Sequence, residues 1–422
     1  MKNKLAIHGG SKAISFKFKK YNTIGKEEIF SVTKVLKSGV LSEYVAENDK
    51  NFFGGAQVIE FEKAWSKFFK VKYSISVNSW TSGLTTAIGA IGIEPGDEII
   101  VSPWTMTASA AAIIHWNAIP VFVDIDPDTF CIDPKKIEEK ISKNTKAIIV
   151  VDIFGQSANM KEIINIAKKN NLKVISDSAQ APTAKYFGRY AGTLANIGGF
   201  SLNCHKHINT GEGGVLVTND RDLAKKMRLI RNHAEVILRN SDPLINMIGH
   251  NYRMGEMEAT IGIQQLKKIN YFVKNRQEAA KRLTKGLRKL KGLQVPKIPK
   301  NQTHVFYIYP IKLDIEKIGV SRDKIYEALL REGVQGLMDK YQNLHLLPIY
   351  QNKIAYGSKG FPWSISQSFI NYNKGICPVA EKLQDKYFIG IQMCKFKYDK
   401  KEINGIINAF KKVWLNLEKL KI

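Results

Sequence analysis

The chain has 422 residues, 44% of them hydrophobic and 24% charged, which leaves room for more than one domain and a sizeable core. No apolar run approaches the roughly 20 residues that cross a bilayer, no secretory leader is recognisable, and the four cysteines form no CxxC pair. These features argue against a membrane protein, a disulfide-bonded secreted domain and a zinc site, and they favour a reducing cytoplasm.

The formal net charge of +26 has three interpretations. The lysines are dispersed and not gathered into one block with aromatic residues, which is typical of solvated helices. A basic surface also attracts small anionic substrates such as nucleotide-linked sugars, and it can bind nucleic acid. Charge alone does not decide among them.

Helical and strand patterns alternate over the first half of the chain. Amphipathic periodicity predicts helices over residues 27–38, 58–69, 81–91, 105–115 and 160–170. Short apolar runs predict strands over residues 74–77, 98–101, 120–123, 147–153, 174–176, 197–202 and 214–218. This alternation is typical of an α/β fold in which helices cover both faces of a mostly parallel sheet.

A smaller α+β domain is predicted after this sheet. A long helical stretch over residues 256–290 leads into a strand over 305–311, a helix over 322–332 and a closing helix over 400–417. Residues 348–363 have no clear period and are expected to form a packed loop. We therefore expect a large domain with an N-terminal arm over residues 1–265, and a smaller domain over residues 266–422.

An acid and a lysine follow two of the predicted strands. Asp177 closes one apolar run, and Lys206 follows another just before the glycine-rich turn over residues 211–214. Ligands of such sheets bind at the carboxyl ends of the strands, where both residues fall. A lysine can form a Schiff base and an acid can keep a pyridine nitrogen protonated, so the pair predicts a pyridoxal-phosphate site. The alternatives are a turn residue and a surface lysine, and Gln180 three positions after Asp177 favours the functional interpretation.

Hydroxyl groups precede the helix predicted over residues 81–91. Residues 78–83 link a strand to this helix, and a helix start favours a phosphate through its free N–H groups and its dipole. Serine and threonine there also serve as simple helix caps. His205 and His207 flank Lys206 and are expected to be satisfied polar residues, because two nearby histidines do not make a metal site.

With these motifs in order, the chain resembles the DegT/StrS sugar aminotransferases, which are fold-type I enzymes that use pyridoxal phosphate. The likeness runs over nearly the whole chain and is densest from residue 77 to residue 266. It rests on six segments: residues 81–82, 96–103, 120–126, 177–181, 201–214 and 249–254.

The resemblance implies roles around the cofactor. Lys206 would be the Schiff-base lysine and proton shuttle, Asp177 would pair with the pyridine nitrogen, and Gln180 would bond the ring hydroxyl. The expected phosphate ligands are Thr81, Ser82 and Ser201. A dehydratase branch of the family replaces this lysine by histidine, and this chain keeps the lysine.

The resemblance also implies an obligate homodimer with shared active sites. Asn251 would reach the cofactor of the neighbouring subunit, and Arg253 nearby would contact substrate. His345 and Trp363 are further candidate substrate contacts, with packing as the alternative role for each.

Three positions depart from the family pattern. Met106 stands where an aromatic ring usually stacks on the cofactor, and Trp104, two residues earlier, is the other candidate for this contact, since a thioether also packs on an aromatic face. Trp80 replaces the small residue that commonly precedes the phosphate-binding threonine. Ser176 replaces the common acid before Asp177.

The expected activity is transfer of an amino group from L-glutamate to a keto-sugar, nucleotide-linked, through a pyridoxamine phosphate form of the cofactor. The product would serve amino-sugar and surface-polysaccharide biosynthesis. One alternative is a cyclitol (inosose-type) aminotransferase, because residues 5–10 resemble that branch too, and glutamine is the alternative donor. Another is a non-catalytic regulatory or DNA-binding protein on the same fold. We expect a cytoplasmic enzyme without metal, nucleic-acid or membrane partners.

Overall fold

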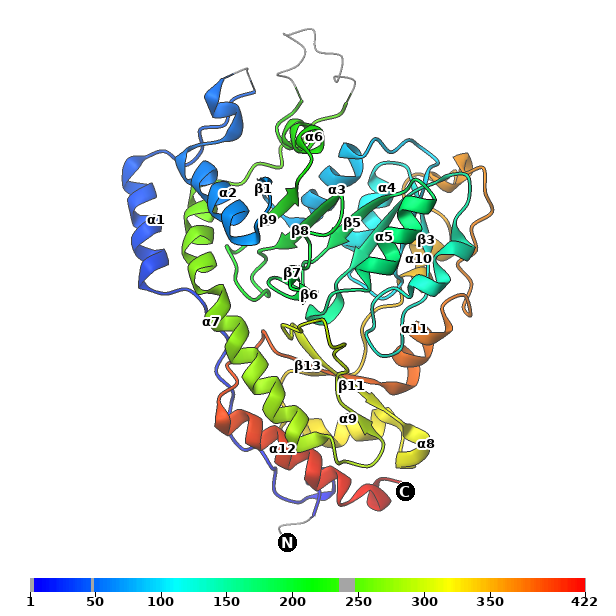
Figure 1. Cartoon of the computed structure of the whole chain (residues 1–422). Coiled ribbons are helices and arrows are strands. Elements are labelled where there is room, and N and C mark those ends of the chain that lie inside the picture. Colours follow the sequence, from blue (N-terminus) through cyan, green and yellow to red (C-terminus); the bar gives the residue numbers. More distant parts are fainter. Residues whose placement is uncertain (1–3, 47–48, 235–246, 422) are drawn as a thin grey trace.

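The computed structural model describes residues 4–46, 49–234 and 247–421 (Figure 1). Its largest sheet has seven strands in the order β1-β9-β8-β5-β4-β2-β3. They are β1 (Tyr73–Val77), β2 (Glu98–Val101), β3 (Ile119–Phe122), β4 (Thr145–Val151), β5 (Lys173–Asp177), β8 (Ile197–Ser201) and β9 (Gly214–Thr218). Only β9 pairs antiparallel with its neighbours, and the other pairs are parallel. The prediction of a mostly parallel sheet is confirmed.

Helices cover both faces of this sheet, because its strands are apolar on both sides. Val215 and Val217 of β9 pack in one core with α2 (Ala56–Phe69) and α7 (Glu256–Leu287), whereas Leu216 packs in the core on the other face. That second core contains residues of α3 (Trp80–Ala90), α4 (Ala108–His115), α5 (Met160–Lys169) and α6 (Arg221–Arg231). Of these helices, the sequence analysis did not predict α6.

A four-stranded antiparallel sheet forms the second unit, in the order β10-β11-β13-β12. Its strands are β10 (Leu293–Gln294), β11 (Ile308–Leu313), β12 (Leu337–Met338) and β13 (Phe388–Gln392). The helices of this region are α8 (Ile315–Ile318), α9 (Arg322–Arg331) and α12 (Lys400–Trp414). A short hairpin of β6 (Lys185–Tyr186) and β7 (Arg189–Tyr190) stands apart from both sheets.

Helix α7 joins the two units. Its first half places Leu266 and Ile269 in the core of the large sheet, and its second half places Leu283 and Leu287 in the core of the small one. Figure 1 shows α12 lying along that second half. The buried Glu256 in the first turn accepts hydrogen bonds from the backbone of Gln57 and Val58, so it also caps α2.

The two cores do not divide the chain at one point. Leu5, Ile14 and Phe18 of the N-terminal arm pack in the core of the small sheet. In the other direction, the segment that carries α10 (Pro348–Gln351) and α11 (Pro378–Lys382) returns to the core of the large sheet. Residues 348–363, expected to be a loop, therefore include a short helix. The division of the chain into two domains at residue 265 stays a prediction. Each of the two cores contains residues from both sides of this position.

Helix α1 (Lys26–Ser38) lies against α7 on the outer side of the molecule (Figure 1). Among the described residues, no helix combines the length and the apolar character that crossing a bilayer requires.

Candidate active site

The carboxyl ends of β1, β5 and β8 lie at one edge of the large sheet, because these strands are parallel. Asp177 is the last residue of β5, and Lys206 follows β8 by five residues. Helix α3 begins three residues after β1 ends. The structure thus brings the predicted acid, the predicted lysine and the hydroxyl-bearing helix start to the same edge.

Three donors hold the buried carboxylate of Asp177. The indole N–H of Trp80 donates to Oδ1 over 2.7 Å, and the Ser109 hydroxyl donates to Oδ2 over 2.8 Å. The backbone N–H of Ala179 also donates to Oδ1, over 3.2 Å. A carboxylate that is only 5% exposed needs hydrogen-bond donors in place of the water it has lost. Trp80 departs from the family pattern, but the sequence alone does not connect it, or Ser109, with Asp177.

Lys206 lies in the turn after β8. Its Nζ is 4.7 Å from the centroid of the Tyr307 ring, and in the described part of the chain no carboxylate lies within ion-pair distance of it. Burial lowers the pKa of the Lys206 amine, and the charge of nearby Asp177 opposes this effect in part. A larger share of this amine is therefore neutral at pH 7 than for a surface lysine, which is the form that attacks a carbonyl.

His207 is a structural residue beside Lys206. Its Nε2 lies 2.9 Å from the carbonyl oxygen of Val305, and the ring is fully buried. Burial holds the pKa of His207 well below its usual value, so the ring is neutral. The expectation of a satisfied polar residue is met at Nε2, whereas Nδ1 is buried without a hydrogen-bond partner among the described residues.

The start of α3 carries the expected phosphate ligands. Ser79 caps the helix, since its hydroxyl accepts a hydrogen bond from the backbone N–H of Ser82 over 3.1 Å. Thr81 is exposed and Ser82 is half-buried, in the first turn, where the helix dipole and the N–H groups that the Ser79 cap does not occupy favour an anion. Ser201 lies at the end of β8, and its hydroxyl accepts from the backbone N–H of Asn203 over 3.3 Å. Phosphate binding by Thr81, Ser82 and Ser201 stays a prediction.

Gln180 is held in one orientation by two groups. Its Oε1 accepts from the backbone N–H of Phe154 and its Nε2 donates to the Tyr341 hydroxyl, each over 2.8 Å. Burial raises the pKa of Tyr341 to about 12, so this hydroxyl is protonated at neutral pH. The side chain is close to Asp177 in the same turn, but a bond to the cofactor's ring hydroxyl stays a prediction.

The structure separates the two candidates for stacking on the cofactor. Trp104 is fully buried, and its ring packs edge-on against Phe130, Phe154 and Phe388. Met106 is 58% exposed. Trp104 is therefore a core residue with no accessible face, and only Met106 remains a candidate.

Asn251 and Arg253 lie together beside the end of β1. The Arg253 Nε donates to Asn251 Oδ1 over 2.9 Å, and the backbone N–H of Asn78 donates to the carbonyl of Tyr252 over 2.9 Å. This segment is thus tied to the strand that leads into α3. Its reach into a neighbouring subunit stays a prediction.

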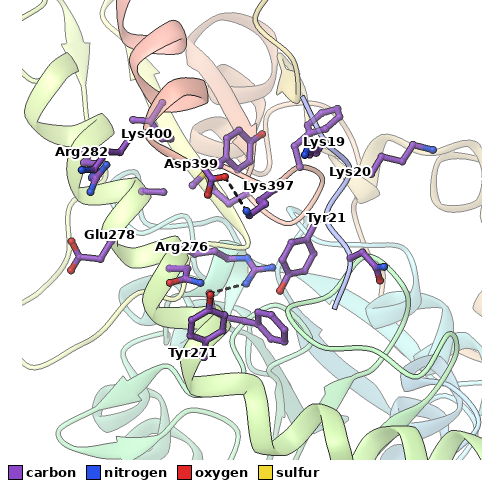
Figure 2. Close-up of a pocket in the computed structure, with 18 residues that line it drawn as sticks. Lys19, Lys20, Tyr21, Tyr271, Arg276, Glu278, Arg282, Lys397, Asp399 and Lys400 are labelled. Carbon is purple, nitrogen blue, oxygen red and sulfur yellow. Dashed lines mark hydrogen bonds and ion pairs between the residues drawn. The ribbon is translucent and has the colours of Figure 1, made fainter. Parts of the chain in front are cut away.

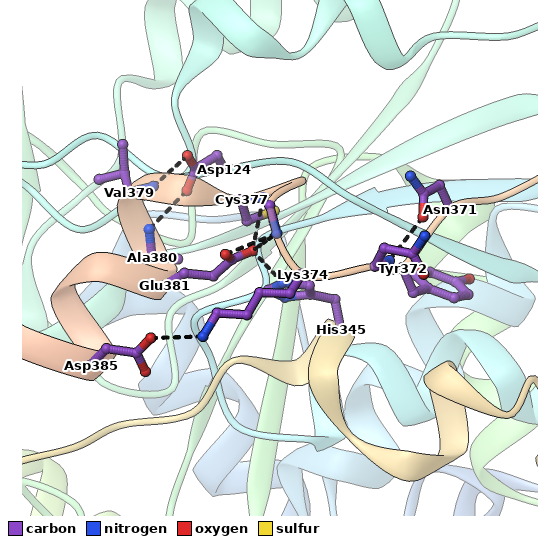
Figure 3. Close-up of polar contacts among 12 residues, drawn as sticks. Asp124, His345, Asn371, Tyr372, Lys374, Cys377, Val379, Ala380, Glu381 and Asp385 are labelled. Atoms are coloured by element: carbon purple, nitrogen blue, oxygen red, sulfur yellow. Dashed lines mark hydrogen bonds and ion pairs between the residues drawn. The ribbon is translucent and has the colours of Figure 1, made fainter.

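The expectation that His345 and Trp363 contact substrate is corrected. His345 is fully buried, and its Nε2 lies 2.9 Å from Glu381 Oε1 (Figure 3). Glu381 also accepts from the backbone N–H of Gly375, and Asp124 accepts from the first N–H groups of α11. This network fastens the returning segment to the large sheet. Trp363 is 8% exposed and donates to the Tyr372 hydroxyl within the same core.

A cavity of about 540 Å³ lies between the N-terminal arm, α7 and the start of α12 (Figure 2). Cationic and aromatic side chains line most of it, among them Lys19, Lys20, Tyr21, Tyr271, Arg276, Arg282, Lys397 and Lys400. Two carboxylates also line it, Glu278 and Asp399, and Asp399 pairs with Lys397 over 3.0 Å. The Tyr21 hydroxyl donates to the carbonyl of His207, so the cavity adjoins the segment that carries Lys206.

The residues at the sheet edge fit pyridoxal phosphate. A partly buried amine of lowered pKa can form the imine, and a carboxylate fixed by donors on both oxygens can accept a hydrogen bond from the pyridinium N–H and so keep that nitrogen protonated. Gly214 leaves the start of α3 open, since a Cβ there would lie 2.8–2.9 Å from backbone atoms of Ser79 and Trp80. The chemistry of these residues, with the open approach to the start of α3, fits this cofactor.

Comparisons with known proteins agree with this site. The family model of the DegT/DnrJ/EryC1/StrS aminotransferases matches residues 23–372. The chain is 37% identical to the GDP-perosamine synthase of Caulobacter vibrioides over 70% of this chain and 79% of that one. It is 29% identical, over 100% of this chain and 99% of that one, to a Micromonospora echinospora protein named for L-glutamine:3-amino-2,3-dideoxy-scyllo-inosose amino transfer.

A solved aminotransferase from Psychrobacter cryohalolentis has the same fold, with a TM-score of 0.83 and 27% identity, covering 95% of this chain and 100% of that one. The chain therefore belongs to the DegT/DnrJ/EryC1/StrS aminotransferase family, and it is a pyridoxal-phosphate-dependent aminotransferase.

Proposed function

We propose that this enzyme moves an amino group from L-glutamate to the ketone of a nucleotide-linked sugar, for amino-sugar and surface-polysaccharide biosynthesis. The observation that carries the proposal is the placement of Lys206 and Asp177 at one sheet edge, in a chain related to a GDP-perosamine synthase. The basic cavity beside the Lys206 segment supports an anionic substrate.

Each residue of the site has a task in this reaction. Bound pyridoxal phosphate supplies an electron sink and carries the amino group between two half-reactions. Lys206 holds the cofactor through Nζ and, once the donor has displaced it, moves a proton at that same atom. Asp177 holds the proton on the pyridine nitrogen. Thr81, Ser82 and Ser201 bind the phosphate, Gln180 bonds the ring hydroxyl, and Met106 packs on the ring.

The second substrate enters after the first product leaves, so the kinetics should be ping-pong. A cyclitol ketone is the second candidate acceptor, favoured by the full-length match to the protein named for scyllo-inosose amino transfer. The intact set of Lys206, Asp177 and Gln180 argues against a non-catalytic, DNA-binding role.

The enzyme is proposed to be a homodimer, with Asn251 and Arg253 reaching the neighbouring active site. Exposed apolar side chains on α1 support this proposal, because such faces are costly in water. A cytoplasmic location is proposed as well, since all four cysteines are free and three of them are buried.

The visible absorption spectrum of the purified protein tests the proposed chemistry. We expect a yellow band that bleaches on addition of L-glutamate and returns with 2-oxoglutarate. A band that responds only to L-glutamine would change the donor. A Lys206→Ala variant should lose the half-reaction, and one that transaminates at the normal rate would contradict the assignment. Nucleotide-linked keto-sugars and scyllo-inosose, offered in parallel, identify the acceptor by the mass of the aminated product.

A further inference from the structure

Trp80 connects the two ends of the cofactor site. It is the first residue of α3, directly before Thr81 and Ser82, and its indole N–H donates to Asp177 Oδ1 over 2.7 Å. The side chain is only 5% exposed. One side chain at the start of the phosphate-binding helix thus holds the acid assigned to the pyridine nitrogen.

Two glycines make the space for this indole. A Cβ at Gly199 of β8 would lie 2.0 Å from Trp80 Cζ3, and a Cβ at Gly83 of α3 would lie 2.5 Å from Trp80 Cε3. Neither glycine has a positive φ, so backbone conformation does not require glycine at these positions. The absent side chains instead leave the ring room to lie flat across the strand and reach Asp177.

The two side-chain donors to Asp177 lie on different oxygens. Trp80 donates to Oδ1, and Ser109 donates to Oδ2 over 2.8 Å. A carboxylate bonded at one oxygen can turn about its terminal torsion, whereas donors on both oxygens fix its plane. Oδ1 also accepts from the backbone N–H of Ala179, so the remaining acceptor site of the carboxylate is on Oδ2, where a pyridinium N–H can donate.

We infer that Trp80 is a positioning residue: its indole N–H fixes the Asp177 carboxylate in the orientation that accepts a hydrogen bond from the pyridinium N–H. The inference rests on the proposed role of Asp177. It goes beyond that role because it assigns a function to a side chain that does not itself touch the reacting atoms. Simple packing is the competing explanation, and it would make the N–H dispensable.

The test uses the cofactor-loaded enzyme and a matched control. Trp80→Phe keeps an aromatic ring but removes the N–H. Trp116→Phe removes an indole N–H that also bonds to α3, at the carbonyl of Thr85 over 2.7 Å, but does not touch Asp177. The pH midpoint of the visible band and the rate of cofactor loss are measured for both variants.

We expect Trp80→Phe to lose the cofactor about tenfold faster or more, as for removal of a hydrogen bond to a charged group, and to shift the pH midpoint. Trp116→Phe should leave both quantities close to the wild type. Equal behaviour of the two variants would overturn the inference. A wild-type protein without a visible band would instead contradict the proposed function, so the two failures are distinguishable.

Gly83→Ala gives an independent test should Trp80→Phe not fold. The added methyl pushes the indole away while leaving its N–H intact. We expect the same direction of shift in the pH midpoint as for loss of the N–H. A folded Gly83→Ala protein with a wild-type midpoint and wild-type cofactor retention would overturn the inference.

Discussion

Asp152 is a second buried acid, one strand away from Asp177. It follows β4, and its side chain accepts hydrogen bonds from the hydroxyls of Ser176 and Ser178 and from the backbone N–H of Ala158. The two serines flank Asp177 in the sequence, so Asp152 braces the end of β5. Burial raises the pKa of Asp152 to about 6, against these hydrogen bonds, which lower it.

This raised pKa predicts a pH-dependent stability. An acid whose pKa is higher in the folded state than in the unfolded one contributes stability at low pH, and this contribution is lost as pH rises through about 6. The wild-type protein should therefore gain on the order of 1 kcal/mol relative to Asp152→Asn between pH 7.5 and pH 5. Urea unfolding of both cofactor-free proteins at the two pH values measures the difference.

The comparison with Asp152→Asn cancels the titration of the other groups, which both proteins share. A difference in unfolding free energy that is independent of pH would contradict the raised pKa. If the stability of the wild type relative to Asp152→Asn instead increased toward high pH, the pKa of Asp152 would be lowered in the folded state and not raised.

Residue positions at strand ends could be predicted, and their partners could not. Asp177 and Lys206 follow apolar runs whose ends meet at one edge in any parallel sheet. The donors to Asp177 come from Trp80 and Ser109, 97 and 68 positions away, and only the assembled fold brings them together. The sequence leaves substrate contact and packing open for His345, and only the fold shows that its Nε2 lies against Glu381 within the core.

At the scale of elements, the contact between α2 and α7 is unusually close. Gly262 of α7 faces Phe61 of α2, and a Cβ at Gly262 would lie 2.7 Å from Cε2 of that ring. Phe61 is fully buried in the core beneath β9. The glycine therefore sets the distance between the two helices, at the cost of weaker helix propensity.

Gly262→Ala should destabilise the protein. Alanine adds up to about 1 kcal/mol of helix propensity, but overpacking against a fully buried ring costs about 1–3 kcal/mol, so we expect a net loss. Denaturant unfolding measures it. Adding Phe61→Leu should recover part of the loss, because the two sites are in contact and their effects are not additive. A more stable Gly262→Ala protein would show that the helices separate freely.

Elements with a strong period could be predicted, and short ones could not. The strands of the large sheet are four to seven residues long and almost wholly buried, and the short apolar runs within them mark them in the sequence. Strands β10 and β12 have two residues each, too few for any period. Helix α6 was missed although Asp220 caps it and its buried face has helical spacing, so a helix-start signal could have found it.

At the scale of the whole molecule, the chain crosses between its two cores more than once. The N-terminal arm packs against the small sheet before the chain enters the large one, and the segment around α10 and α11 returns to the large core. A sequence pattern reports which residues are buried but not which core they join. For this reason a single boundary at residue 265 describes the order of the elements better than their packing.

The proposed homodimer makes a prediction about α1. One side of this helix packs on α7 through Glu28 and Val35, and Glu28 pairs with Lys268 of α7. Its other side exposes Ile29 and Phe30, each 62% accessible, and Leu36, 54% accessible. Three large apolar side chains exposed on one outer helix indicate an interface. A dimer with twofold symmetry would bury these side chains on both subunits.

The double variant Phe30→Glu with Leu36→Glu should convert the dimer to a monomer. Burying a large apolar side chain contributes about 1.5–3 kcal/mol, so two lost contacts on each subunit should weaken association at least 100-fold. Light scattering after gel filtration measures the mass. Leu415→Glu, at a side chain 79% exposed outside α1, is the matched control and should remain dimeric. Because Asn251 and Arg253 are proposed to complete the neighbouring site, the monomer should also lose transamination. A double variant that stays dimeric, or a wild-type protein that is monomeric and active, would contradict the shared active site.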